Sequence, residues 1–470
     1  MNIRRTKIIA TVGPSCSTPE IIQEMVEKGV NCFRVNLSHG SVEDKEFYFK
    51  LIQSVQLPNG ERPTILGDLA GPKIRVSDLE SPYELKDGDL VTISNEITGE
   101  NVIPVSKGVK FQKVEEGAQI LINDGRIGLE VVKHVSNSTL ECKTVTAGLV
   151  ENRKGVNFPG VALDVPSLTE QDKIDLKIAL ENGADWIALS FVRSPSDYDL
   201  VRSRVRELGY TTPIMAKIEK WEAVQNIDGI IDVFDAVMVA RGDLGVELPI
   251  ERVPLIQKDV IDKASKAGKP VIIATQILDS MTERPVPTRA EVSDIANAIL
   301  DGADALMVTG ETAMGEFPGK FIEVLARVIE ETESAINYKN YIISKEEGRI
   351  NTANAISHAA CSVAIDQDIK ILITMTHSGS TARMVSRYRP AARIIAMTPN
   401  EGISRRLSIV WGVTSFLICK YTSSDEIPDI ADEILIRESL LSEGEKYVIT
   451  GGVPVGIPGT TNFLSVLKRG

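Results

Sequence analysis

Short apolar runs recur along the first two thirds of the chain, and each gives way to polar or small residues. Helical stretches such as 19–28 and 169–182 lie between most of them. This alternation predicts a parallel sheet, and near-continuous apolar strands indicate burial on both faces. Eight such strands predict a closed (β/α)₈ TIM barrel, whose chemistry lies at the carboxyl ends of the strands. The predicted strands are 8–13, 32–37, 64–69, 186–189, 212–219, 236–243, 271–274 and 305–308.

The alternation is interrupted once, by residues 70–164. This stretch lacks convincing helical periodicity but contains short strand-like runs at 90–93, 119–122, 127–132 and 139–145. A structureless loop of that length is improbable, so we predict a small inserted β-barrel domain. The insertion leaves from the catalytic face, where it can act as a lid that excludes water. A passive loop insertion is the alternative.

After residue 338 the pattern becomes that of a separate open α/β domain, residues 339–470. Helices are expected at 353–365, from 380, at 402–411 and at 427–441, and strands at 370–374, 393–396, 413–418 and 446–449. Residues 339–351 are the predicted linker. The barrel then comprises 1–69 and 165–338 with the lid at 70–164, and a length of 470 residues is compatible with three domains.

Composition narrows the classes of partner. A net charge of −13 without a basic tail disfavours nucleic acid. No apolar run approaches membrane-spanning length and the first residues lack a signal-like apolar region, so we expect a cytoplasmic protein without a membrane partner. The five cysteines form no CxxC pair and are expected to be reduced thiols.

Two predicted strands end in acids. Glu219 ends strand 212–219 and Asp243 ends strand 236–243, while Lys217 precedes Glu219 by two residues and shares its strand face. Mg²⁺ is typically held by one or two carboxylates, with water and substrate phosphate as further ligands. This trio therefore suits a divalent cation and an anionic substrate. An ordinary salt bridge is the alternative, but polar residues recur at the strand ends.

Several segments resemble, in order, the motifs of pyruvate kinases of the bacterial and archaeal type that lack an additional C-terminal extension. They are Phe-Arg-Val-Asn-Leu-Ser-His-Gly at 33–40, Ala-Lys-Ile-Glu at 216–219, Met-Val-Ala-Arg-Gly-Asp-Leu-Gly at 238–245, Ala-Thr-Gln at 274–276, Pro-Thr-Arg-Ala-Glu at 287–291 and Gly-Glu-Thr-Ala at 310–313. The resemblance covers the whole chain. It implies Mg²⁺- or Mn²⁺-dependent phosphoryl transfer from phosphoenolpyruvate to ADP, giving pyruvate and ATP in the last step of glycolysis.

The resemblance also implies catalytic roles. Arg34 and Lys217 hold the transferred phosphoryl group, and Lys217 also neutralises the departing enolate, as expected where catalysis is mainly positioning and charge neutralisation. The backbone of Gly242 and Asp243 binds the substrate carboxylate. Thr275 binds the same carboxylate near the carbon that receives the proton.

Metal and nucleotide ligands follow from the same resemblance. Glu219 and Asp243 hold Mg²⁺. The implied nucleotide-binding residues are Asn36, Leu37, Ser38, His39, Arg75 and Lys154. The implied monovalent-cation position is formed by Asn36, Ser38, Asp68 and the backbone carbonyl of Leu69.

Lys73 is a departure with a predicted consequence. It stands where potassium-dependent members of the resembling family carry glutamate. Its ammonium group supplies positive charge and repels a second cation at short range. We therefore predict that K⁺ is not required. The alternative is a lysine that only points into solvent.

A second phosphate site is predicted in the C-terminal domain. A hydroxyl-rich turn between a strand and a helix suits a phosphate, with a simple helix cap as the alternative. In the resembling family this loop often receives a phosphorylated effector within a homotetramer. Residues 451–462 are expected to face it. The turn consists of Thr376, His377, Ser378, Gly379, Ser380 and Thr381.

The sequence leaves open the roles of two residues and does not exclude two other functions. Arg241 is expected to brace strands, and Glu311 is either a neighbour of Lys217 or only a strand-end acid. The alternative functions are another Mg²⁺-dependent enolpyruvate enzyme and a catalytically silent phosphometabolite sensor. Retention of the catalytic set disfavours the sensor, while His39 and Lys154 disfavour an enzyme that needs no ADP.

Overall fold

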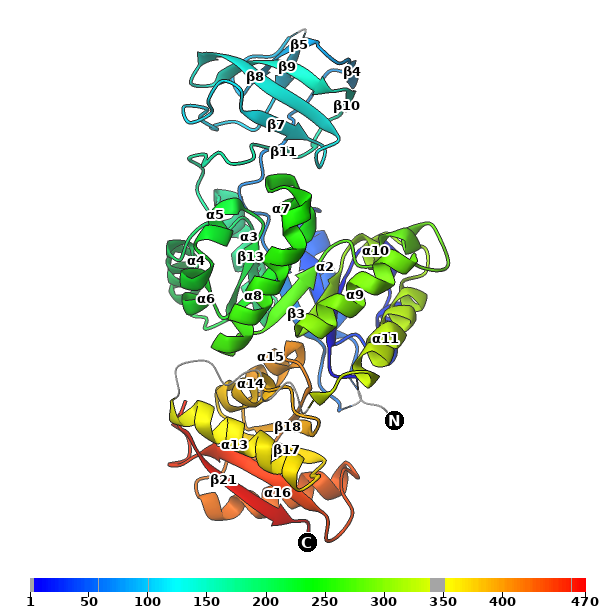
Figure 1. The fold of residues 1–470 in the computed structure, drawn as a ribbon, viewed down its shortest axis with the longest axis vertical. Helices are drawn as coiled ribbons and strands as arrows, with labels where there is room; N and C mark the ends of the chain where they lie inside the picture. Colours follow the sequence, from blue (N-terminus) through cyan, green and yellow to red (C-terminus); the bar gives the residue numbers. More distant parts are fainter. Residues whose placement is uncertain (1–3, 58, 100, 339–350, 458) are drawn as a thin grey trace.

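The computed structural model describes residues 4–57, 59–99, 101–338, 351–457 and 459–470. The predicted linker lies outside these residues except for residue 351. Figure 1 shows three parts stacked along the long axis, with the lid at one end, the barrel in the middle and the C-terminal domain at the other end. The residue boundaries proposed between them stay predictions.

Eight parallel strands close into a barrel, which confirms the central prediction. Their order around the ring is β1-β2-β3-β12-β13-β14-β15-β16. Every residue of these strands except two in β2 is buried, as a sheet covered on both faces requires. The bounds are β1 (Lys7–Thr11), β2 (Cys32–Asn36), β3 (Thr64–Asp68), β12 (Trp186–Leu189), β13 (Ile214–Ile218), β14 (Ala236–Ala240), β15 (Val271–Ala274) and β16 (Ala305–Val308).

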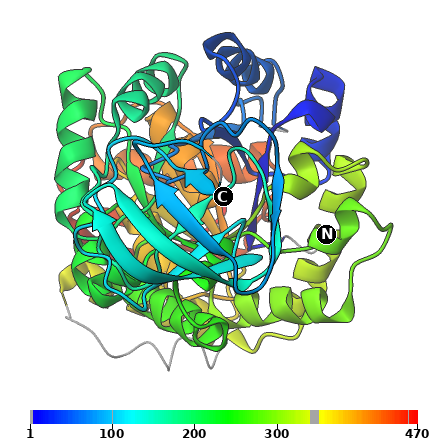
Figure 2. The same ribbon diagram turned by 90° about the horizontal axis from the view of Figure 1, so that it is seen from above.

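Helices surround the barrel (Figure 2). Three of the longer ones begin with capping boxes, in which Ser41, Thr169 and Thr288 accept a backbone N–H three residues on. The longer helices are α1 (Pro19–Glu27), α2 (Val42–Gln53), α3 (Glu170–Glu181), α4 (Ser196–Glu207), α8 (Val253–Ala267), α9 (Arg289–Asp301) and α11 (Pro318–Ser334). The shorter ones are α5 (Trp221–Gln225), α6 (Ile227–Val233), α7 (Arg241–Glu247) and α10 (Gly310–Ala313).

Helix α7 corrects one expectation. Strand β14 ends at Ala240, and Asp243 lies in the first turn of α7 rather than at a strand end. The apolar run predicted the strand correctly, but Arg241 and Gly242 already have helical backbone geometry. Asp243 therefore reaches the barrel mouth from a helix.

The insertion is all β, as predicted, and Figure 2 shows it over the barrel. Its strands form a six-stranded sheet, β11-β7-β8-β9-β5-β6, and a two-stranded sheet, β10-β4, rather than one closed ring. It has its own core, in which the rings of Phe111 and Phe158 lie 5.6 Å apart. The bounds are β4 (Tyr83–Leu85), β5 (Leu90–Ser94), β6 (Val102–Pro104), β7 (Gln119–Ile122), β8 (Ile127–Ser136), β9 (Thr139–Thr146), β10 (Gly148–Val150) and β11 (Val156–Asn157).

The C-terminal domain is an open α/β sheet of order β19-β18-β17-β20-β21, as predicted in class. Strand β21 is antiparallel to β20 and was not predicted. Across the described parts of the chain, no helix is both long and apolar enough to span a bilayer. The bounds are α13 (Thr352–Asp366), β17 (Ile371–Met375), α14 (Ser380–Ser386), β18 (Arg393–Thr398), α15 (Glu401–Arg406), β19 (Val413–Leu417), α16 (Ile427–Arg437), β20 (Lys446–Gly452) and β21 (Thr461–Lys468).

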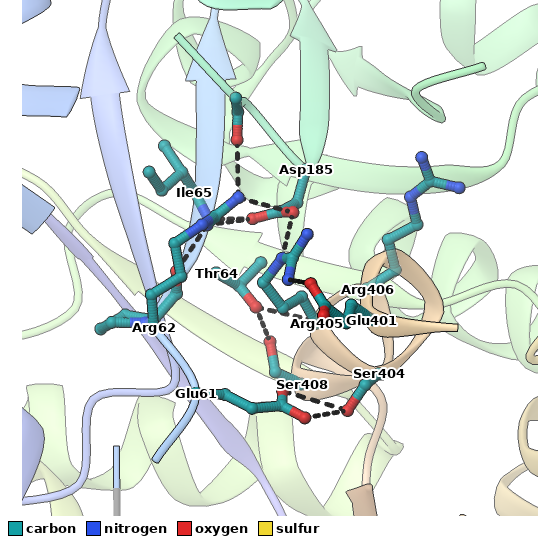
Figure 3. A network of polar contacts seen from close by, with 12 residues as sticks. Glu61, Arg62, Thr64, Ile65, Asp185, Glu401, Ser404, Arg405, Arg406 and Ser408 are labelled. Carbon is teal, nitrogen blue, oxygen red and sulfur yellow. Dashed lines mark hydrogen bonds and ion pairs between the residues drawn. The ribbon is translucent and has the colours of Figure 1, made fainter. Parts of the chain in front are cut away.

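Three aspartates order the bottom of the barrel. Asp185, Asp235 and Asp304 each precede a strand (β12, β14 and β16) and accept a backbone N–H from β3, β13 and β15 respectively, at 2.8–3.0 Å. Two of them also bind the C-terminal domain: Arg405 lies 2.9 Å from Asp185 (Figure 3), and Arg389 lies 3.2 Å from Asp304. These buried carboxylates join the two domains.

Replacing Asp185 by alanine should destabilise this junction. Arg62, 2.8 Å from Asp185, and Arg405 would both lose their buried carboxylate. We expect a loss of about 3–5 kcal/mol in the free energy of unfolding, the usual cost of breaking a buried pair. Urea unfolding followed by tryptophan fluorescence measures it, because Trp186 and Trp411 both lie at the junction.

The matched control is Asp199→Ala, at an exposed position on α4. It should change the free energy of unfolding by no more than about 0.5 kcal/mol. Equal unfolding midpoints for the Asp185 and Asp199 variants would show that the junction does not depend on Asp185.

Candidate active site

Four charged side chains meet at the carboxyl ends of β2, β3 and β13. Arg34 Nε and Nη2 each lie 2.7 Å from Asp68 Oδ2. Lys217 Nζ lies 3.4 Å from the same oxygen and 2.9 Å from Glu219 Oε1. The carboxylates are 1 % exposed and the cations 11 %. Two positive and two negative charges thus compensate one another in a site that excludes most water.

The pKa directions follow from this arrangement. Burial raises the pKa of Asp68, but Lys217 and Arg34 outweigh it and hold that pKa below its usual value. Burial lowers the pKa of Lys217, but Asp68 and Glu219 raise it further than burial lowers it. Burial raises the pKa of Glu219 against the opposing charge of Lys217, and Asp243 adds to the rise. Lys217 is therefore held as a cation by its carboxylate partners, whereas burial and the charge of Asp243 oppose ionisation of Glu219.

Two positions after β12 belong to the site and were assigned no role from the sequence. Ser190 Oγ accepts a hydrogen bond from Lys217 Nζ at 2.7 Å. The Phe191 N–H donates to Glu219 Oε2 at 2.7 Å, from a backbone with a φ of 56°. Their place directly after a barrel strand is the signal that would have identified them.

Lys73 meets Asp243 across the mouth. Lys73 Nζ lies 2.9 Å from Asp243 Oδ1, and both side chains are about a quarter exposed. Within the described residues, Lys73 makes no hydrogen bond or ion pair with Asn36 or Ser38. Leu69 is buried, so that only its backbone is available to a monovalent cation.

Glu219 and Asp243 suit a divalent cation. The charge of Asp243 acts on the pKa of Glu219, so the two carboxylates lie within electrostatic range of each other. Each is already met by an ammonium group, from Lys217 and Lys73 respectively. No cluster of three or more His, Cys, Asp or Glu ligands occurs in the part of the chain that the structure describes. This donor set fits Mg²⁺ that takes its remaining ligands from substrate and water.

The loop after β15 is held in an unusual backbone conformation. Thr275 and Gln276 have φ values of 68° and 54°. Arg241 donates to both of their carbonyl oxygens, at 2.8 and 3.0 Å, and pairs with Asp294, which confirms its expected bracing role. The Gly242 N–H donates to Thr275 Oγ1 at 2.9 Å, and a Cβ on Gly242 would lie 3.3 Å from that oxygen.

Residues 36–39 form the turn that follows β2. Asn36 Oδ1 accepts the Ser38 N–H at 3.1 Å. Leu37 is 1 % exposed, so only its backbone can reach a ligand. The pKa of His39 is lowered, first by burial and then by four neighbouring cations. These cations are Arg75, Arg34, Lys45 and Lys73.

The lid supplies the other two predicted nucleotide ligands. Arg75 Nη1 donates to the Arg153 carbonyl oxygen at 3.0 Å, which joins the outgoing and returning chains of the lid. Lys154 lies 3.3 Å from Glu151 and is partly exposed. Of these two cations, Arg75 also acts on the pKa of His39, so its charge reaches the turn at 36–39.

Among the described residues, Glu311 makes no hydrogen bond or ion pair with Lys217, whose partners are Asp68, Glu219 and Ser190. It accepts the Thr309 N–H at 2.6 Å, and its Oε1 is buried without a hydrogen-bond partner. Burial raises its pKa. Glu311 lies in the first turn of α10 rather than at the end of β16, so it is a helix acid that holds the turn between these two elements.

The C-terminal domain contains the second predicted site. One pocket is lined from both loops, so the two loops face each other as expected. Its lining includes Thr376, Thr381, Gly452, Gly456, Ile457, Gly459, Thr460 and Thr461. Thr381 Oγ1 and Thr461 Oγ1 lie 2.8 Å apart across it. The Gly379 N–H donates to Thr376 Oγ1 at 2.9 Å, from a left-handed backbone with a φ of 79° that glycine adopts without strain. His377, Ser378 and Ser380 also line the pocket.

Comparison with known proteins agrees with this geometry. The family described as pyruvate kinase, barrel domain, matches residues 3–322, and pyruvate kinase, alpha/beta domain, matches residues 354–467. A pyruvate kinase of Clostridium acetobutylicum is 41 % identical over 473 residues, covering 99 % of each chain. A pyruvate kinase of Sporosarcina psychrophila is 42 % identical, covering 99 % of this chain and 80 % of that protein.

A solved structure extends the agreement to three dimensions. The crystal structure of a pyruvate kinase from Cryptosporidium parvum matches with a TM-score of 0.92 and 34 % identity, covering 99 % of this chain and 96 % of that one. The sequence motifs, the barrel, the lid and the C-terminal sheet thus all indicate the same family. The chain belongs to the pyruvate kinase family.

Proposed function

We propose that the barrel mouth binds phosphoenolpyruvate beside a divalent cation and passes its phosphoryl group to ADP held under the lid. Family membership makes the chain a phosphotransferase with this reaction, which gives pyruvate and ATP. The residue roles below are the proposal. The observation that carries them is the buried cluster of Arg34, Asp68, Lys217 and Glu219 at the rim of the barrel.

Lys217 and Arg34 are assigned to the transferred phosphoryl group. Lys217 is a protonated cation held by Asp68, Glu219 and Ser190, so its ammonium group has a fixed position. Negative charge builds on the enolate oxygen as its bond to phosphorus breaks, and Lys217 neutralises it. Arg34 balances the anionic phosphoryl oxygens during transfer.

Glu219 and Asp243 are assigned to the divalent cation, Mg²⁺ or Mn²⁺. When bound, this cation supplies positive charge next to the substrate oxygens. Gly242 and Thr275 are assigned to the substrate carboxylate, because the hydrogen bond from the Gly242 N–H to Thr275 Oγ1 holds both groups together in the mouth and leaves the Thr275 hydroxyl proton to donate to a ligand. Thr275 would then lie beside the enolate carbon that takes a proton to become the methyl group of pyruvate.

The nucleotide is assigned to the turn at 36–39 and to Arg75 and Lys154. The cations that lower the pKa of His39 suit the polyphosphate of ADP, which would compensate them. The lid would exclude water, the competing acceptor of the phosphoryl group.

Assembly, regulation and location are further parts of the proposal. The facing loops of the C-terminal pocket supply several hydroxyl groups for a phosphorylated effector. A homotetramer and a cytoplasmic location rest on the resemblance alone.

Replacing Lys217 by methionine tests the catalytic assignment. Loss of the ammonium group should lower kcat at least about a hundredfold. The KM for phosphoenolpyruvate should change less, because the enolate charge is larger in the transition state. Steady-state kinetics with coupled detection of pyruvate measure both values.

Lys177→Met, at an exposed position on α3, is the matched control and should keep normal kinetics. Circular dichroism checks that both variants fold. A Lys217→Met enzyme with more than a tenth of the original kcat would contradict the assignment.

Lys73 tests the monovalent-cation proposal. Lys73 forms an ion pair with Asp243, and its charge also lowers the pKa of His39. It therefore acts on both the proposed divalent-cation site and the proposed nucleotide site. We expect substantial activity in tetramethylammonium buffer and little gain from KCl at constant ionic strength. Lys73→Glu should confer activation by K⁺, whereas Lys73→Gln should not. A tenfold or larger gain from K⁺ in the unmutated enzyme would rule out Lys73 as the substitute cation.

The C-terminal pocket is tested by Ser380→Asp, which places a carboxylate among its hydroxyl groups. A sugar phosphate such as ribose 5-phosphate should lower the phosphoenolpyruvate concentration for half-maximal rate in the unmutated enzyme. Ser380→Asp should abolish this response and keep basal activity, and Ser380→Ala should retain part of it. The coupling must be reciprocal, so phosphoenolpyruvate should also tighten effector binding. If sugar phosphates and nucleoside monophosphates neither bind nor alter the kinetics, the turn is only a helix cap.

A further inference from the structure

A separate pocket lies where the bottom of the barrel meets the C-terminal domain. Its barrel wall is formed by the starts of β12, β13, β14 and β15, and its other wall by α14 and α15. It has a free volume of about 240 Å³. A single buried water needs only about 10–15 Å³ by the same kind of measure. The pocket is at the opposite end of the barrel from the catalytic mouth.

The charge of this pocket is strongly unbalanced. Four lining residues are cationic, and among the lining residues, all within the described chain, Asp235 alone is acidic. Arg202 lies 2.8 Å from Asp235 and occupies that carboxylate. The remaining cations are Lys269, Arg383 and Arg406.

None of these three cations has a carboxylate within 4.0 Å in the described part of the chain. Lys269 Nζ donates to the Phe234 carbonyl oxygen at 2.7 Å, and Arg383 reaches only the Ser378 carbonyl oxygen, at 3.4 Å. Arg406 Nε is buried without a hydrogen-bond partner. Burial lowers the pKa of all three groups by more than the charge of Asp235 raises it.

The partners of Asp235 differ from those of the other two aspartates that precede barrel strands. Asp185 and Asp304 each bind an arginine of the C-terminal domain directly. Asp235 is bound by a barrel arginine instead, and Arg383 and Arg406 stand across the pocket. Figure 3 shows the Arg406 guanidinium pointing away from the network around Asp185, without a partner in that network. At this third position a small anion would complete the contact between the domains.

We propose that this pocket is an anion site that takes a phosphate group, either inorganic phosphate or a phosphate monoester. Lys269 would contact it from the barrel, and Arg383 and Arg406 from the C-terminal domain. Guanidinium groups match phosphate oxygens in number and geometry. The free volume leaves room for an ester substituent as well as the phosphate.

Such a ligand would bridge two domains. A ligand that binds only the folded state raises the free energy of unfolding with the logarithm of one plus the ratio of ligand concentration to Kd. Ser378 and Gly379 also line this pocket, so the turn at 376–381 separates it from the predicted effector pocket. The site does not rest on the proposed catalytic roles, and its test must distinguish it from both other phosphate sites.

The test is calorimetric titration of the full-length enzyme with inorganic phosphate at constant ionic strength. Arg406→Gln should raise the Kd for phosphate at least tenfold while keeping the turnover of phosphoenolpyruvate and ADP. Arg206→Gln, an exposed arginine on α4, is the matched control and should bind as the unmutated enzyme does. Ser380→Asp should also keep this binding, because Ser380 lines only the effector pocket. Equal affinity in Arg406→Gln and the unmutated enzyme overturns the proposal.

Two further variants keep the test decisive if Arg406→Gln does not fold. Lys269→Gln removes the barrel cation and should weaken phosphate binding in the same way. Thr211→Glu places a carboxylate at the exposed rim of the pocket, where it should raise the thermal midpoint and remove the stabilisation by phosphate. Thr211→Gln is its uncharged control. If phosphate still stabilises Thr211→Glu and Lys269→Gln as it does the unmutated enzyme, the pocket is not its site.

Competition between ligands distinguishes the two sources of phosphate. Ribose 5-phosphate that displaces inorganic phosphate with a lower Kd, and does so in the Ser380→Asp enzyme too, identifies a phosphorylated metabolite as the ligand. Displacement only at a higher Kd identifies free phosphate. Absence of any Arg406-dependent binding by either ligand overturns the proposal.

Discussion

The buried cluster of Arg34, Asp68, Lys217 and Glu219 is the constraint on which the rest of the structure depends. Its charges have little water around them, so each needs its partners in place, and removing one would cost about 3–5 kcal/mol. The closed barrel provides those places, because continuous parallel register brings the ends of β2, β3 and β13 to one rim. A slip of one residue in any of these strands would turn its charged side chain to the other face.

The fold was predictable where burial dictates the sequence. All eight barrel strands are mainly apolar because both of their faces are covered, and that pattern is visible in the chain. The short lid strands β4, β6, β10 and β11 were missed because two or three residues carry no periodicity. Strand β21 was missed because, apart from buried Thr461, its residues are only partly buried or exposed at a sheet edge. Edge strands with one partner lack the apolar run that marks a central strand.

The site was predictable only as far as single strands allow. Lys217 and Glu219 share a face because side chains alternate along a strand, and the structure places them 2.9 Å apart. Contacts between strands depend on barrel closure, so the hydrogen bonds from Lys217 to Ser190 and from Phe191 to Glu219 could not be derived. The pairing of Lys73 with Asp243 also requires the orientation of the lid hinge relative to α7.

The two ends of the barrel handle charge in opposite ways, and the difference follows from where the charges originate. In the catalytic cluster, two cations and two carboxylates come from the ends of three strands of one closed sheet, so their numbers balance within the barrel. At the bottom, carboxylates come from the barrel and most cations from the C-terminal domain, so balance depends on how the domains meet. Asp185 and Asp304 achieve it directly, whereas the region around Asp235 keeps an excess of positive charge. A domain junction whose charge balance depends on a bound anion is sensitive to that anion, and a catalytic rim balanced by its own residues is not.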